Sequence, residues 1–177
     1  ATMDGHGGAL WASLGWLPVI LLPYTGLLAV TLARLRADWT DPLRRYLWIW
    51  FGTAFVVFSL SSTQLPHYLL YGCTPLFVLM AVHRDGLRSR WLAFVPPLLL
   101  AATLLLLPEL LQLAEPYAKR LYEKEVIALG RSLLDPGYRI GMAAALAAVL
   151  AAALWRRLAP WQGLVAVGFV LLIAVTG

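Results

Sequence analysis

A long uncharged stretch separates Arg45 from His83 and is interrupted once, near its middle. The stretch contains 37 residues without Asp, Glu, Lys or Arg. A transmembrane helix takes about 20 apolar residues, so this stretch is too long for one span and suits two. The interruption, Ser59–Tyr68, combines hydroxyl residues, an amide, a proline and a histidine. We therefore expect two membrane-spanning helices joined by a short polar turn.

The composition of the whole chain is that of a membrane protein. Hydrophobic residues make up 61% of the 177 residues, charged residues make up 13%, and the mean hydropathy is +0.76. Ordinary soluble domains are less apolar. The net charge of +5 comes from Lys and Arg residues in short clusters between apolar segments, so nucleic-acid binding is not predicted. The expected fold class is all-α, a polytopic transmembrane helix bundle.

Charge-free segments predict about six spans within a single transmembrane domain of residues 1–177. The predicted spans are residues 9–32, 46–60, 66–82, 91–107, 140–155 and 158–176. Loops 33–45, 83–90 and 156–157 hold nine basic and three acidic residues, whereas the opposite side holds five and six. Because basic loops stay in the cytoplasm, we expect the N-terminus, the Ser59–Tyr68 turn and segment 108–139 to face the periplasm or exterior of a bacterial inner membrane.

Segment 108–139 is the one long non-membrane stretch in this topology. Pro116 suits a first helical turn and Gly130 suits a helix stop. Four residues recur at helical spacing and would line one face: Ala118, Tyr122, Val126 and Leu129. The pattern predicts an amphipathic helix on the outer membrane surface. An element that gates substrate access is the alternative interpretation.

Two polar elements are predicted to meet at the outer surface. His6 lies among glycines, which allow the backbone to approach a ligand, and a histidine there can donate to a phosphate. His67 follows Pro66, which suits the first position of a helix whose free N–H groups favour an anion. Thr63 and Gln64 add hydroxyl and amide donors. A solvated loop and a capped hairpin turn without a ligand would explain the same residues.

Several kinds of chemistry are not predicted for this chain. No predicted span has a central ionisable residue, which weakens ion-coupled transport as an interpretation. The sequence lacks a Gly-Lys-Ser/Thr phosphate loop, a Gly-x-Ser-x-Gly elbow and Cys/His spacing suited to a metal. We predict neither a cofactor nor a metal. Cys73 is the only cysteine, so it offers no intrachain disulfide.

The segment Phe58–Leu70 resembles the Phe-Ser-Leu-Ser-x-Thr-Lys-Leu-Pro-His-Tyr segment of bacterial polyprenyl-phosphate-sugar glycosyltransferases. These enzymes are relatives of the protein O-mannosyltransferases and of the lipid A aminoarabinose transferase. Gly5–Gly8, followed by an aromatic-rich span and Leu22–Tyr24, resembles a loop and helix of the same family, and the likeness covers about residues 1–85. It implies the C-terminal part of a C-type glycosyltransferase fold. The chain lacks an initial Met and ends behind an apolar span, which fits a piece of a longer protein.

The resemblance implies sugar transfer from a polyprenyl-phosphate carrier to a lipid, glycan or protein acceptor at the outer face, with phosphate as the leaving group. It implies an acidic catalytic base upstream and none in this chain. The implied substrate-binding residues are His67, Gln64, Tyr68, His6 and Thr63.

Gln64 departs from the family pattern, which has Lys at that position. Either another cation serves the phosphate, or the position depends less on charge. Two other functions remain open from the sequence: a transporter or flippase domain, and a non-catalytic membrane subunit.

Overall fold

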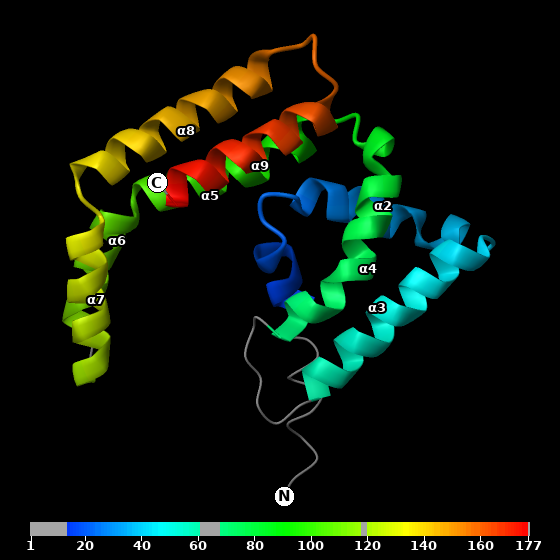
Figure 1. Cartoon of the computed structure of the whole chain (residues 1–177), viewed down its shortest axis with the longest axis horizontal. Helices are drawn as coiled ribbons and strands as arrows, with labels where there is room; N and C mark the ends of the chain where they lie inside the picture. The colour runs from blue at the N-terminus through cyan, green and yellow to red at the C-terminus, as the bar shows by residue number, and fades with distance from the viewer. Residues whose placement is uncertain (1–13, 61–67, 118–119, 177) are drawn as a thin grey trace, which may run out of the picture. The chain divides into compact units, whose positions relative to one another are not determined.

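The structure, a computed structural model, describes residues 14–60, 68–117 and 120–176, and these residues contain helices and no strand. The all-α prediction is therefore confirmed for the described residues. The chain divides into two compact units, Ala1–Ala93 and Phe94–Gly177. Figure 1 shows the helices α2 (Thr25–Asp38), α3 (Pro42–Leu60), α4 (Tyr68–Val82), η1 (Arg84–Gly86), α5 (Arg90–Leu105), α6 (Leu107–Ala114), η2 (Glu115–Tyr117), α7 (Leu121–Leu133), α8 (Pro136–Leu154) and α9 (Pro160–Thr176).

The first predicted span, residues 9–32, is not one continuous helix. Residues 14–20 are helical, residues 21–24 form a turn, and α2 then continues six residues past the predicted end. Helix α2 lies beside the segment that follows α4. A Cβ on Gly86 would be 2.9 Å from Cγ1 of Val30, and a Cβ on Gly26 would overlap the carbonyl oxygen of Leu92. Glycine at position 26 therefore permits the close approach of the two backbones.

Helices α3 and α4 pair along their lengths and form a helical hairpin in the first unit (Figure 1). The two helices pack closely at Gly72, where an added Cβ would lie 2.9 Å from Cβ of Ala54. The 19 residues of α3 correspond to about 28 Å of helix. The hairpin connection coincides with the Ser59–Tyr68 segment that the sequence predicted as a turn. Its residues 61–67 lie outside the described part of the chain.

In the second unit, α8 and α9 also pair. The hydroxyl of Tyr138, at the start of α8, donates a 2.7 Å hydrogen bond to the carbonyl oxygen of Leu104, at the end of α5. Beside it, Nη2 of Arg139 lies 2.7 Å from Oε1 of Glu109. Segment 105–137 therefore leaves the end of α5 and comes back to that same end, where α8 begins.

In the described part of segment 108–139, the helices α6 and α7 and the short helix η2 take the place of the single predicted helix. Gly130 lies inside α7 instead of at its end. Its lack of a side chain leaves room for α6, since an added Cβ would be 3.2 Å from Cδ1 of Leu111. The prediction of a helix stop at Gly130 was wrong. Tyr122, Val126 and Leu129 are all exposed on α7, as the predicted apolar face requires.

Among the described residues, α8 alone is long and apolar enough to cross a bilayer as a single helix. A second candidate is the pair formed by α5 and residues Leu107–Tyr117, which is bent by 59°. Residues Gly72–Val82 and Pro160–Thr176 are apolar but shorter. The count of six spans therefore stays a prediction.

Candidate functional site

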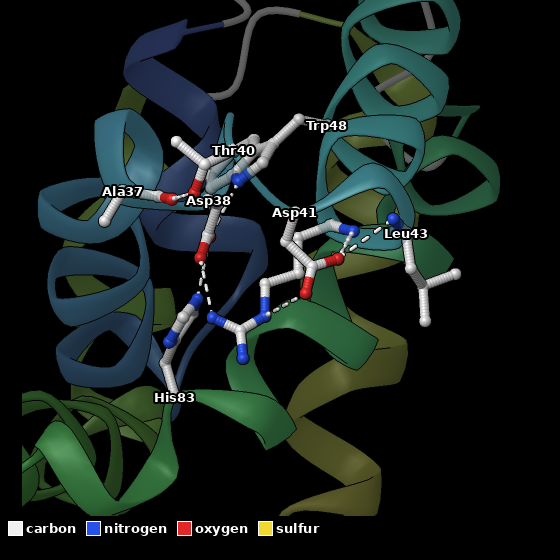
Figure 2. A network of polar contacts seen from close by, with 8 residues as sticks. Ala37, Asp38, Thr40, Asp41, Leu43, Trp48 and His83 are labelled. Carbon is white, nitrogen blue, oxygen red and sulfur yellow. Dashed lines mark hydrogen bonds and ion pairs between the residues drawn. The ribbon is translucent and has the colours of Figure 1, made fainter.

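A polar cluster of the first unit surrounds the carboxylate of Asp38, whose side chain is 0% exposed. Figure 2 shows Trp48 of α3 and His83, which follows α4, beside this carboxylate. Trp48 Nε1–H donates to Oδ2 at 3.0 Å, and Arg44 Nη1–H donates to Oδ1 at 3.3 Å. Nε2 of His83 lies 2.8 Å from Oδ2. Since an ionised carboxylate only accepts, this histidine nitrogen carries the proton.

The local sequence explains how Asp38 is held between α2 and α3. Pro42 opens α3, and the carboxylate of Asp41 just before it accepts hydrogen bonds from the backbone N–H groups of Leu43 at 2.9 Å and Arg44 at 3.0 Å. This is the usual N-cap arrangement with proline at the first helical position. Nε of Arg44 also lies 3.7 Å from Oδ2 of Asp41. The cap thus orients the arginine that reaches Asp38 (Figure 2).

The balance of forces on Asp38 favours its charged form. Burial alone would raise the pKa of the carboxyl, but hydrogen bonds from Trp48, His83 and Arg44, together with the charge of His83, outweigh burial and hold the pKa below its ordinary value. A buried carboxylate with this many donors is a stabilising centre whose loss leaves several polar groups without a partner.

The lowered pKa of Asp38 predicts acid sensitivity. The unfolded carboxyl, with an ordinary pKa of about 3.9, takes up a proton before the folded one does. The stabilisation is therefore complete above pH of about 4 and is lost as the pH falls through the folded pKa. We expect the free energy of unfolding in detergent micelles to fall below pH of about 4, and to fall less steeply in Asp38→Asn. Identical pH profiles for the two proteins would contradict this assignment.

The cluster lies at the end of the α3–α4 hairpin that is remote from the Ser59–Tyr68 segment. Arg44 and Trp48 belong to the first two turns of α3, and His83 directly follows α4. Loops 33–45 and 83–90, which the charge pattern predicted on one side, are joined by the contact between Asp38 and His83. The hairpin therefore has a closed polar end, and the Ser59–Tyr68 segment belongs to the opposite end.

Most of the predicted substrate-binding residues lie outside the described part of the chain. His6, Thr63, Gln64 and His67 are among them. Tyr68 is the first described residue of α4, and the start of this helix that the sequence predicts at Pro66 lies outside the described residues. The structure therefore does not test where this helix starts or whether these side chains meet.

Sequence reasoning missed Asp38 and His83 as a pair. Asp38 was counted as one of three acids in basic loops, and His83 was used only to mark the end of the uncharged stretch. One available signal was that His83, Asp38 and Trp48 all flank predicted spans on the same side. Residue counts in a loop do not reveal which acid is buried, and the contact spans 45 residues of sequence.

The second unit contains an open cleft of about 650 Å³ between the start of α8 and the end of α9. Its polar groups include the carboxylate of Asp135, which caps α8 by accepting from the N–H of Tyr138 at 2.8 Å. The cleft is lined by Asp135, Gly137, Tyr138, Gly141, Ile173, Ala174, Val175 and Thr176. No group of three or more His, Cys, Asp or Glu side chains suited to a metal occurs among the described residues.

The fold and cluster define an all-α protein with a helical hairpin closed at one end by a buried carboxylate. Comparisons of the chain with protein-family models, curated proteins and solved structures each find no significant match. The expected glycosyltransferase family therefore rests on the motif residues of the sequence.

Proposed function

We propose that this chain is part of a polytopic membrane glycosyltransferase that takes a sugar from a polyprenyl-phosphate carrier at the outer face of the membrane. The observation that carries the proposal is the position of the motif Phe58–Leu70, which spans the connection between the paired helices α3 and α4. A connection between two adjacent helices places its polar residues together at one end of the pair. A lipid-linked phosphate at a membrane surface needs such an arrangement.

The arrangement of the first unit supports the proposed topology. The hairpin is about 28 Å long by the residue count of α3, close to the roughly 30 Å hydrocarbon core of a bilayer. The loops with the basic excess meet at one end through Asp38 and His83, and the motif belongs to the other end. With the basic end in the cytoplasm, the motif faces the periplasm.

The second unit supports an outer surface for segment 108–139. The helices α6 and α7 contact each other but leave large apolar side chains exposed. These exposed side chains are Leu110, Leu113, Tyr117, Leu121, Tyr122, Val126 and Leu129. In the proposed membrane location they would enter the boundary between headgroups and acyl chains, while Lys124 and Glu125 remain exposed to water.

In the proposed reaction, an acceptor oxygen attacks the anomeric carbon of the sugar, and the bond between that carbon and the carrier phosphate oxygen breaks. The phosphate leaves with the bonding electrons and gains negative charge. A general base outside this chain removes the acceptor proton. His67, Gln64 and the free N–H groups at the start of α4 would stabilise the departing phosphate.

Gln64 offers a direct test of this phosphate contact. A lysine there would add a charge-assisted hydrogen bond to the carrier phosphate, which is about twice as strong as a neutral one. We expect Gln64→Lys to lower the KM for a polyprenyl-phosphate sugar by about fivefold, from roughly 1 kcal/mol of added binding. The measurement is the transfer of radiolabelled sugar in membranes from cells that express this chain within the full-length enzyme, which supplies the general base.

The matched control is Gln112→Lys, which adds the same charge to an exposed glutamine of α6 on the predicted outer side. It should leave KM unchanged. An equal fall in KM for both variants would indicate that an added positive charge attracts the anionic carrier wherever the charge is placed. Absence of transfer from any polyprenyl-phosphate sugar, in membranes that contain the inserted protein, would refute the proposed function.

A further inference from the structure

Exposed arginines occur in the three segments that meet at the closed end of the hairpin. The contact between His83 and Asp38 brings η1 to the end of α2, and the contact between Arg44 and Asp38 brings the start of α3 to the same place. Arg34 is four residues before Asp38, about 6 Å along the helix. We call the exposed group the arginine surface; it consists of Arg34, Arg36, Arg45, Arg84 and Arg88.

The acids of the same segments neutralise this surface only in part. The carboxylate of Asp38 is fully buried, and its oxygens accept from Trp48, Arg44 and His83. The carboxylate of Asp41 caps α3, is 43% exposed and lies 3.7 Å from Nε of Arg44. Asp85 is exposed in η1. Two acids thus face solvent beside five exposed arginines, and the surface keeps a net positive charge.

An exposed tryptophan lies at the same end of the hairpin. Trp39 directly follows α2, one residue after Asp38, and is 50% exposed. Exposed indole rings are unfavourable in water, and they are enriched at the level of lipid headgroups, where one edge of the ring is wet. Arginine beside exposed tryptophan is the chemistry of a membrane interface that contains phosphate.

We infer that the arginine surface binds the phosphate headgroups of anionic phospholipids. Each guanidinium presents a planar set of donors that suits phosphate oxygens. The inference rests on the proposed membrane location of the chain, but it assigns a separate site at the end of the hairpin remote from the motif. Headgroup binding there would hold α2 and η1 at the membrane surface.

The test uses the full chain, purified in a neutral detergent and titrated with dioctanoyl phosphatidylglycerol. Binding is read by native mass spectrometry and by thermophoresis, without any sugar donor. We expect binding of phosphatidylglycerol, little binding of dioctanoyl phosphatidylcholine or inorganic phosphate, and loss of binding near 1 M salt, where the screening length is about 3 Å. Tighter binding of a single-stranded oligonucleotide than of phosphatidylglycerol would overturn the inference in favour of nucleic acid.

The double variant Arg34→Gln/Arg88→Gln should raise the Kd for phosphatidylglycerol by about thirtyfold, since each arginine near an anionic surface contributes about fivefold. The matched control Arg120→Gln/Lys124→Gln removes the same charge from the start of α7, on the predicted outer side. Both double variants should keep the thermal unfolding midpoint of the parent. An equal loss in the control, or equal affinities for phosphatidylglycerol and phosphatidylcholine, would overturn the inference. Neither result would bear on sugar transfer, which is measured separately.

Discussion

Replacing Asp38 with Ala lowers the expected free energy of unfolding by about 3 kcal/mol, the usual cost of breaking a buried ion pair by removing one partner. The carboxylate is fully buried and accepts from Trp48, Arg44 and His83. Without it, the indole N–H and the imidazole lose their acceptor in a site that excludes water. The measurement is equilibrium unfolding of the purified chain in mixed micelles, followed by circular dichroism.

Two further variants distinguish the loss of the buried hydrogen bonds from the loss of an acidic side chain at an exposed position. Asp85→Ala removes an acid of the neighbouring η1 that is exposed, and it should change the free energy of unfolding by less than about 0.5 kcal/mol. Trp48→Phe removes a single donor and should cost about 1 kcal/mol beyond any change in packing. If Asp38→Ala and Asp85→Ala were equally stable, the buried network would not be a stabilising centre.

His67→Ala is expected to lower the rate of sugar transfer by about a hundredfold while the protein still inserts into the membrane. The size follows from the loss of one preorganised donor to the charge that develops on a leaving group. The measurement is the initial rate of transfer from a polyprenyl-phosphate sugar, together with the amount of protein in the membrane fraction.

The matched control is another histidine, His83→Ala, because the two residues belong to opposite ends of the hairpin. His83→Ala removes a donor to Asp38 and should lower the free energy of unfolding. His67→Ala should leave that free energy close to its parent value. An unchanged transfer rate in His67→Ala would remove this residue from the proposed site.

The positions of five helices follow closely from apolar length. The predicted spans 46–60, 66–82, 91–107, 140–155 and 158–176 each coincide with one described helix within a few residues at either end. A bilayer-length run without charges can satisfy its backbone only as a helix, so composition alone locates it. Whether each of these helices crosses a membrane is a separate question that length and composition leave open.

The first span was predicted wrongly as one helix because hydropathy does not register a change of chain direction. Residues 21–24 contain Pro23, a sequence signal for a break, but they are as apolar as their neighbours. The predicted end at residue 32 stopped at the first charge, although arginine is a good helix former and α2 runs on through Arg34 and Arg36. Charge marks a membrane boundary and not a helix boundary.

The polar cluster around Asp38 could not be predicted from local sequence, because its residues are far apart in the chain. Asp41 and Pro42 form a recognisable helix start, so the position of Arg44 in α3 could have been predicted. The burial of Asp38 depends on the return of the chain to that place at His83. Likewise, Gly130 continues a helix that its residue type would end, because α6 packs against it.

The fastening of the hairpin at Asp38 limits how its two helices can move. Arg44 and Trp48 hold the start of α3 to Asp38, and His83 holds the end of α4 to the same carboxylate. The chain itself joins the other ends of the two helices, between Leu60 and Tyr68. The pair is therefore joined at both ends, so the end at Asp38 can splay open only if the buried contacts of this carboxylate break.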